Sequence, residues 1–202
     1  MIPSRLVRGI DQKNIMPVVF AAGNSNLDCG GGPSILCINS NEGGITAAAL
    51  DRQGRPQDYS SRGPGQCTPF APFIGAPTYG VLPWGDGYRD FGPRGGGTSS
   101  AAPEVSGALA VLKGAYPKAD NTTLRVALAA GAKREPFTSG LLPFNTGSGF
   151  GMLQVDQALA VLPFARLHPF YFPIALRFAK PPGTRGPVFA ELVKASSGER
   201  KG

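Results

Sequence analysis

The chain has 202 residues, and its 20 basic against 13 acidic side chains leave a net charge of +7. Glycine and proline, at 29 and 20 residues, are roughly twice as frequent as in an ordinary protein, which predicts many turns. The hydrophobic share of 42% is too high for an intrinsically disordered chain, and the glycines have no three-residue period, so collagen is excluded as well. We expect one globular domain, or one domain with part of a second.

Three further classes are disfavoured by composition. The most apolar stretch, residues 158–176, contains Arg166, His168 and three prolines, so we expect no membrane span. The basic residues are scattered rather than gathered in a stripe with stacking aromatics, so we expect no nucleic-acid partner. Three cysteines cannot all pair in one chain, which excludes a disulfide scaffold, and we expect no zinc site. The first nine residues lack the apolar run of a secretory signal, so the start is either mature sequence or a cut.

A helix followed directly by a strand opens the chain. Leu6, Val7 and Ile10 have helical spacing and predict an amphipathic helix over residues 4–14. Residues 17–22 form a short apolar run rich in β-branched residues, which is typical of a buried parallel strand. This order predicts an α/β layer fold.

Further elements follow in chain order. We expect a long exposed loop over residues 23–44, a strand over 45–50 and a turn over 51–55, then short extended segments over 72–76 and 79–82 and a turn-rich stretch over 84–97. Helices are expected from about residue 101 to a stop near Tyr116 and Pro117, over 122–130 and over 153–161. The middle helix would take Asp120 or Asn121 as its cap, with Gly131 just beyond its end.

The composition changes after residue 162. Residues 1–162 are expected to form one domain, whereas residues 163–202 mix aromatic, proline and basic residues with strands predicted at 174–178 and 188–193. This second region is interpreted as a linker, the start of a further module or a frayed terminus, with a disordered end.

A glycine-rich loop enters the first of the later helices. Residues 95–103 read Gly-Gly-Gly-Thr-Ser-Ser-Ala-Ala-Pro, which places hydroxyl groups at a helix N-terminus, where backbone N–H groups favour negative charge. This setting suits a nucleophilic serine whose reaction develops an oxyanion. The simpler alternative is that Thr98, Ser99 or Ser100 only caps the helix. A phosphate-binding loop would require the Gly-Lys-Ser/Thr ending that is missing here.

Several motifs together resemble the subtilases, the subtilisin-like serine proteases. Residues 97–103 match every fixed position of the family's Gly-Thr-Ser-x-Ala-x-Pro motif. The other matching segments keep the family's order and lie at residues 18–24, 45–51, 59–64, 74–77 and 149–153. The resemblance covers residues 4–162 and implies a three-layer α/β fold with a central parallel sheet flanked by helices, present as its C-terminal half only.

The resemblance also implies roles for individual residues. Ser99 would be the nucleophile and Asn24 the oxyanion donor, so the two should converge. Ala21, Ala22 and Gly23 would line one wall of the primary specificity pocket. The substrate would be a polypeptide and the protein a secreted one, extracellular or in the cell envelope. No cofactor is identified; the family often carries structural calcium, but no carboxylate cluster here identifies a site.

Two departures from the family pattern stand out. Glu104 replaces the His that many relatives have after the motif, and we expect it in the first turn of its helix, stabilised by the dipole. The triad Asp and His should precede the Asn24 strand, yet no such segment is present. Asp28 and Asp90 are interpreted as loop acids, and His168 follows Ser99 in the wrong order. We therefore expect a fragment that lacks its N-terminal half and is inactive alone.

Two alternatives to a protease are considered. A non-catalytic module could bind peptide along a strand edge. An α/β-hydrolase would require Gly-x-Ser-x-Gly, which residues 97–101 fail to match.

The pairing of the cysteines is left open by the sequence. Cys29 and Cys37 could form a disulfide in an oxidising compartment or remain two thiols, and Cys67 would be free or paired elsewhere.

Overall fold

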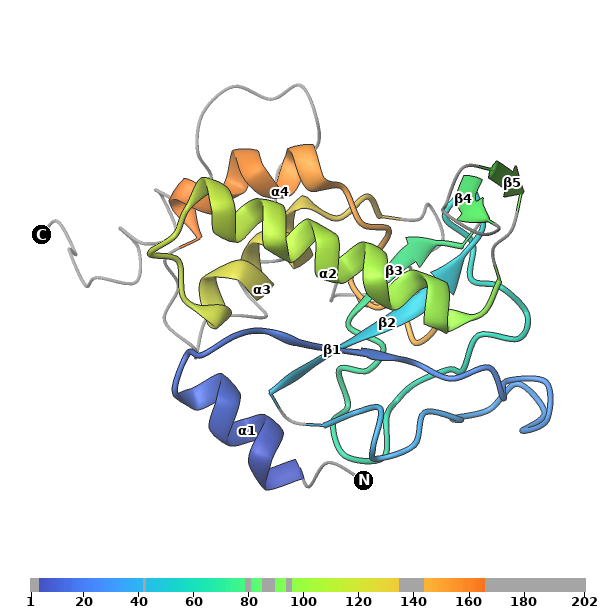
Figure 1. Cartoon of the computed structure of the whole chain (residues 1–202). Helices are drawn as coiled ribbons and strands as arrows, with labels where there is room; N and C mark the ends of the chain where they lie inside the picture. Colours follow the sequence, from blue (N-terminus) through green and yellow to red (C-terminus); the bar gives the residue numbers. More distant parts are fainter. Residues whose placement is uncertain are drawn as a thin grey trace, which may run out of the picture.

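The computed structural model describes residues 4–41, 43–78, 81–84, 90–93, 96–134 and 144–165. Its elements in chain order are α1 (Ser4–Gln12), β1 (Val18–Ala21), β2 (Gly44–Leu50), β3 (Ile74–Pro77), β4 (Val81–Trp84), β5 (Asp90–Pro93), α2 (Thr98–Ala115), α3 (Asn121–Gly131), α4 (Val155–Val161) and the 3-10 helix η1 (Leu162–Phe164) (Figure 1). His168 and the two strands predicted after residue 170 lie outside the described residues. None of the described helices is long and apolar enough to cross a membrane.

The central sheet is parallel and has the order β1-β2-β3. Val18 pairs with Gly44, and Ala47 pairs with Ile74. Every residue of β2 from Ile45 onward is buried, because β2 lies between the other two strands. A strand covered on both faces needs an apolar side chain at nearly every position, which explains the continuous apolar run. The prediction that residues 17–22 and 45–50 form neighbouring parallel strands is confirmed.

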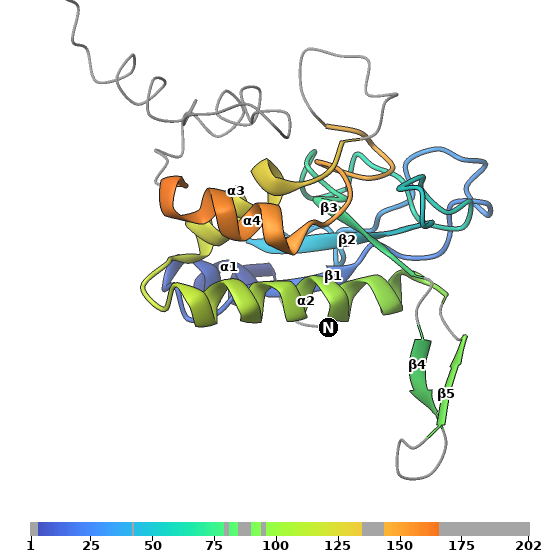
Figure 2. The ribbon, with the colours of Figure 1, turned by 90° about the horizontal axis from the view of Figure 1, so that it is seen from above.

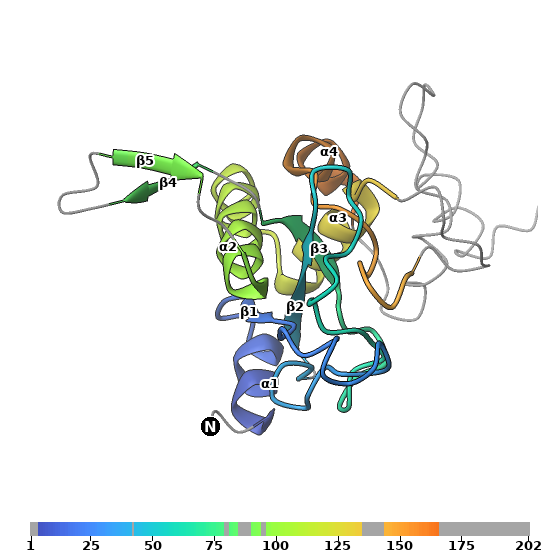
Figure 3. The ribbon, with the colours of Figure 1, turned by 90° about the vertical axis from the view of Figure 1, so that its right-hand side faces the viewer.

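Helix α2 packs along the sheet and completes the main core. Its apolar stripe is buried, as predicted from the spacing of Ala101, Val105, Leu109 and Leu112. Helices α1 and α2 lie on opposite sides of β1 (Figures 1 and 3). Helices α3 and α4 pack against each other and share one buried cluster with α2 and the sheet. The α/β architecture inferred from the sequence is thus the observed one.

Three details of the helices complete or correct the predictions. In α1 the buried residue is Val7, whereas Leu6 is 53% exposed, so the apolar face is narrower than its sequence spacing indicates. The cap of α3 is Asp120, whose Oδ1 accepts a hydrogen bond from Thr123 N at 2.7 Å. Gly131 is the last residue of α3 rather than the residue beyond it. A side chain there would collide with the backbone of Ala158 in α4, so this glycine serves helix packing.

Residues 84–97, expected to be only turns, contain half of an antiparallel hairpin. Strands β4 and β5 pair with Val81 opposite Pro93 and Trp84 opposite Asp90. The hairpin projects away from the central sheet (Figure 2). Asp90 therefore belongs to a strand and not to a loop as expected. The glycine and prolines of these strands are unfavourable strand residues, so their sequence has no clear strand pattern.

The disulfide joins a different pair of cysteines from the one considered in the sequence. Cys37 is bonded to Cys67, with Cα atoms 4.7 Å apart, and Cys29 is an exposed free thiol. The bond ties the long loop after β1 to the loop before β3. Cys37 and Cys67 pair because the fold brings their two loops together, and the spacing of the cysteines along the chain does not indicate this contact.

Candidate active site

Ser99 lies at the start of α2, in the first helical turn. The N-cap residue is Gly97, with φ 78° and ψ 155°, and no side chain caps this end. Ser100 Oγ donates to Gly96 O at 2.9 Å, whereas the described residues offer no hydrogen bond to the exposed Ser99 hydroxyl. Ser99 is therefore available for chemistry rather than engaged as a helix cap.

Asn24 is oriented by Thr98. Its Oδ1 accepts hydrogen bonds from Thr98 N at 2.9 Å and from Thr98 Oγ1 at 3.1 Å. A backbone N–H can only donate, so the amide atom that faces it must be the oxygen. The amide nitrogen Nδ2 consequently points away from Thr98, with both of its protons free of this contact.

The Asn24 amide nitrogen and the Ser99 hydroxyl face the same small space beside Gly97. A Cβ atom on Gly97 would lie 3.1 Å from Asn24 Nδ2 and 3.2 Å from Ser99 Oγ. The two polar atoms are therefore at most about 6 Å apart, since both surround this one point. Both atoms thus lie close to Gly97 Cα, on the side where any other residue would carry its Cβ. Groups that stabilise an oxyanion must converge in this way around one substrate carbonyl. The structure thus brings Ser99 and Asn24 together, as the sequence predicted.

Of the three residues expected along a specificity wall, Ala21 ends β1, and Ala22 and Gly23 follow it directly. Ala22 is 1% exposed and belongs to a small buried cluster with Ile35 and Ala71, whereas Ala21 and Gly23 are partly exposed. Gly23 has φ 107°, and its N donates to Thr98 Oγ1 at 3.0 Å. Gly23 thus contacts Thr98 next to Ser99, and the role of Ala21, Ala22 and Gly23 toward a substrate stays a prediction.

A second group of contacts, which sequence reasoning missed, holds the two loops together. Ser61 N donates to Gly23 O at 2.8 Å, and Ser61 Oγ accepts from Ser25 N at 3.2 Å. Tyr59 Oη accepts from Gly97 N at 2.9 Å. Tyr59 and Ser61 belong to the matching segment 59–64, but nothing in its residue types indicates which backbone groups they reach.

Glu104 is the acidic residue of α2 that follows the Ser99 motif, and its place differs from the one expected. Helix α2 begins at Thr98, so Glu104 lies in its second turn and not in the first, as was expected. Desolvation raises the pKa of the Glu104 carboxyl, which is opposite to the effect of a stabilising helix dipole. Nowhere in the described part of the chain do three or more His, Cys, Asp or Glu side chains form a metal-binding group. Calcium also binds carbonyl oxygens, which such a group does not include, so we assign neither a calcium site nor a step through calcium.

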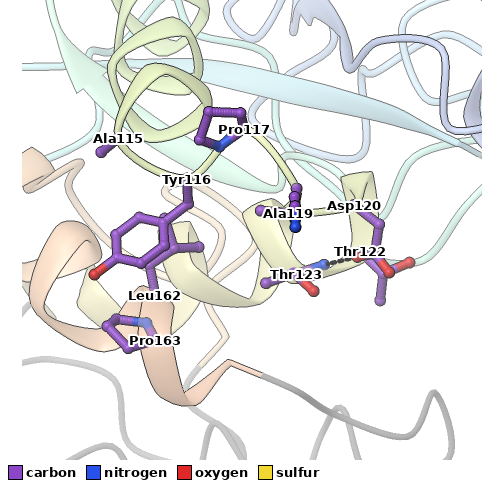
Figure 4. A pocket seen from close by; sticks show the side chains of 10 residues that line it. Ala115, Tyr116, Pro117, Ala119, Asp120, Thr122, Thr123, Leu162 and Pro163 are labelled. Atoms are coloured by element: carbon purple, nitrogen blue, oxygen red, sulfur yellow. Dashed lines mark hydrogen bonds between the residues drawn. The ribbon is translucent and has the colours of Figure 1, made fainter.

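A cavity of about 830 Å³ lies elsewhere, at the opposite end of α2. Figure 4 shows Tyr116, Leu162 and Pro163 along one side and Thr123 and Asp120 along the other. Helix α2 has 18 residues and is roughly 27 Å long, so this cavity is remote from Ser99. It is not part of the candidate active site.

Comparisons with known proteins agree with this geometry. The sequence model described as the Subtilase family matches residues 4–151. No curated protein sequence matches the chain significantly.

Solved protease structures share the fold. The prenylagaramide maturation protease PagA is 23% identical with a TM-score of 0.58, and the alignment covers 78% of this chain and 54% of PagA. A serine protease of Aeromonas sobria is 23% identical with a TM-score of 0.58, covering 82% of this chain and 40% of that one. The self-cleaved protease domain of PatA is 25% identical with a TM-score of 0.56, covering 79% and 54%. The chain thus spans about half the length of these proteases or less.

Proposed function

Because this chain belongs to the subtilase family, we propose that it is the nucleophile-bearing part of a serine endopeptidase that forms an acyl-enzyme on Ser99. The observation that carries the proposal is the convergence of Ser99 Oγ and Asn24 Nδ2 beside Gly97. The motif alone is equally consistent with a serine that caps a helix, whereas a hydroxyl and an amide donor that lie close together suit acyl transfer.

In the proposed reaction, Ser99 Oγ attacks the carbonyl carbon of a peptide bond and its proton passes to a base. The carbonyl oxygen becomes an oxyanion, which Asn24 Nδ2 and the Ser99 backbone N–H stabilise at the start of α2. The C–N bond then breaks, the amine leaves with the proton, and water hydrolyses the Ser99 ester. Ala21, Ala22 and Gly23 would form one wall of the pocket for the substrate side chain nearest the reacting bond, with the buried Ala22 behind the two partly exposed residues.

The base and its carboxylate partner are proposed to come from a segment outside the printed sequence. Among the described strands, β1 pairs on one side only, and all four of its residues are partly exposed. Ile15 and Met16, which lead into β1, are 61% and 57% exposed. An additional strand beside β1 would cover this apolar edge, and the comparison structures have the length to supply it.

A second candidate function is peptide binding without catalysis. The same half-exposed β1 edge favours it, because an extended peptide can add to such an edge by main-chain hydrogen bonds. In that case the Ser99 hydroxyl would not react, which separates the two proposals experimentally.

We also propose an extracellular or cell-envelope location. The Cys37–Cys67 disulfide supports it, since such bonds persist in oxidising compartments.

The test uses a serine-directed phosphonate probe and a fluorogenic peptide, on the 202-residue chain and on a form extended upstream to include an Asp and a His. The extended form should turn over the peptide and be labelled, whereas the 202-residue chain alone should show no useful turnover. Ser99→Ala should abolish labelling, and the matched control Ser106→Ala, on the exposed face of α2, should not. Asn24→Ala should lower kcat by about a hundred- to a thousandfold, a magnitude taken from the oxyanion asparagine of subtilisin. An extended form that binds peptide without labelling would favour the binding module.

A further inference from the structure

Tyr59 contacts both halves of the candidate site, through different groups of one residue. Its main-chain carbonyl accepts a hydrogen bond from Asn26 N at 3.2 Å, two residues after Asn24. Its side-chain hydroxyl accepts a hydrogen bond from Gly97 N at 2.9 Å, two residues before Ser99. Tyr59 therefore bridges the loop that carries the amide and the loop that carries the nucleophile.

The Tyr59 hydroxyl is itself oriented by a buried threonine. Its oxygen lies 3.2 Å from Thr78 Oγ1, and Thr78 Oγ1 donates to Leu50 O, a carbonyl at the end of β2, at 3.4 Å. A hydroxyl has one proton, so Thr78 Oγ1 is left to accept the Tyr59 proton. The lone pairs of Tyr59 then remain for the Gly97 N–H. Each group thus donates to the next, from the Gly97 N–H through the Tyr59 and Thr78 hydroxyls to the Leu50 carbonyl of the sheet.

The Tyr59 hydroxyl is the partner of the Gly97 N–H, whereas the Gly97 carbonyl accepts from Ser100 N at 3.1 Å, within the same loop and helix start. With φ 78° and no side chain, Gly97 occupies a region that glycine enters and leaves readily. A shift there would move Ser99 Oγ relative to Asn24 Nδ2, and a displacement of about 1 Å at a reacting centre can cost a hundredfold in rate.

We propose that Tyr59 is a positioning residue for the Ser99 reaction, which fixes the separation of the Ser99 hydroxyl from the Asn24 amide by holding Gly97. This inference rests on the proposed function. Tyr59 touches no reacting atom, so its removal should change the rate of the chemical step and leave substrate binding nearly unchanged.

The contact is tested without catalysis by amide hydrogen exchange at Gly97, followed by NMR on the 202-residue chain. Tyr59→Phe should speed exchange at Gly97 by about five- to tenfold, since one hydrogen bond is lost. Thr78→Val removes only the acceptor that orients the hydroxyl and should give a smaller increase. Tyr116→Phe is the matched control, because Tyr116 is 40% exposed at the remote cavity, and should change nothing.

The consequence is tested in the catalytically complete protein. Tyr59→Phe should lower kcat roughly tenfold with KM unchanged, and Tyr116→Phe should leave both unchanged. In an Asn24→Ala background the effect of Tyr59→Phe should shrink, because the amide it aligns is gone.

Two results would overturn the inference: unchanged exchange at Gly97 in Tyr59→Phe, or faster exchange with the same kcat. Absence of any Ser99-dependent turnover in the unsubstituted protein would instead contradict the proposed function. The exchange measurement would still decide, in that case, whether Tyr59 holds the Gly97 loop.

Discussion

Thr98 holds Asn24 through two hydrogen bonds to a single atom, with Oδ1 lying 2.9 Å from Thr98 N and 3.1 Å from Thr98 Oγ1. The same Thr98 Oγ1 accepts from Gly23 N at 3.0 Å. One buried hydroxyl therefore joins the end of β1, the amide and the start of α2. The side chain next to Ser99, the proposed nucleophile, thus orients Asn24, the proposed oxyanion donor.

Thr98→Val tests this role. The substitution keeps the shape of the side chain but leaves the Gly23 N–H without its acceptor and Asn24 Oδ1 with one donor fewer. We expect the free energy of unfolding to fall by about 1–3 kcal/mol and kcat by roughly tenfold or more. Thr98→Ser keeps the hydroxyl, so it should retain most of the stability and most of the activity. Denaturant unfolding measures the first and peptide turnover the second. Equal losses in the two variants would assign the effect to the methyl group and contradict this role.

Gly97 and Gly107 should respond in opposite ways to the same substitution. An alanine at Gly97 adopts an unfavourable positive φ and places its Cβ 3.1 Å from Asn24 Nδ2 and 3.2 Å from Ser99 Oγ, so it would push the two groups of the proposed site. Gly97→Ala should therefore abolish turnover and cost about 1–3 kcal/mol of stability. Gly107 lies in α2 with no atom within 4 Å of a new Cβ, so Gly107→Ala should stabilise by about 0.5–1 kcal/mol and keep activity. Paired turnover and unfolding curves measure both, and an active Gly97→Ala protein would refute the proposed site.

The sequence allowed prediction of those strands and helices in which apolar residues recur as the strand or helix requires. The buried run of β2 and the apolar stripe of α2 are continuous, so their type and neighbours could be inferred. The proximity of Ser99 and Asn24 could be predicted because both lie in segments that match motifs of the subtilase family.

The remaining features depend on contacts between distant segments. The β4–β5 hairpin uses Pro83 and Pro93, residues that argue against a strand. The Tyr59 hydroxyl reaches Gly97 N because the packing of β2, β3 and α2 brings their two loops together. From the sequence, a tyrosine at this position is equally consistent with a core aromatic.

Removing the Cys37–Cys67 bond should destabilise the chain. The bond closes a loop with a sequence separation of 30, for which loop-closure entropy predicts a loss of about 3–4 kcal/mol. The paired substitution of both cysteines by serine should show this in denaturant unfolding. Cys29→Ser is the control, because this thiol is exposed and free, and should change stability by less than about 0.5 kcal/mol. Equal stability of the disulfide-free and unsubstituted proteins would show that the bond does not constrain the unfolded chain.

The last prediction concerns the contact that fixes α1 to α3. Arg125 Nη2 lies 2.9 Å from Asp11 Oδ1, and Nη1 donates to Asp11 Oδ2 at 3.2 Å, with both side chains less than one-fifth exposed. Arg125 also donates to the Gly43 carbonyl, just before β2. The guanidinium therefore joins two helices to the start of the central strand, in a setting where water screens it poorly.

Arg125→Met should cost about 2–4 kcal/mol, because Asp11 is left as a largely buried charge without its cation. Arg125→Lys should recover only part of this, since an ammonium cannot make the two parallel bonds. The control is Arg55→Met, which breaks an i,i+4 pair with Asp51 in which the arginine is 67% exposed, and should cost no more than about 1 kcal/mol. Added salt should weaken the Arg55 contribution more than that of Arg125, as measured by urea unfolding at two sodium chloride concentrations. Similar losses and similar salt dependence for the two arginines would show that burial does not set the strength of the Asp11 contact.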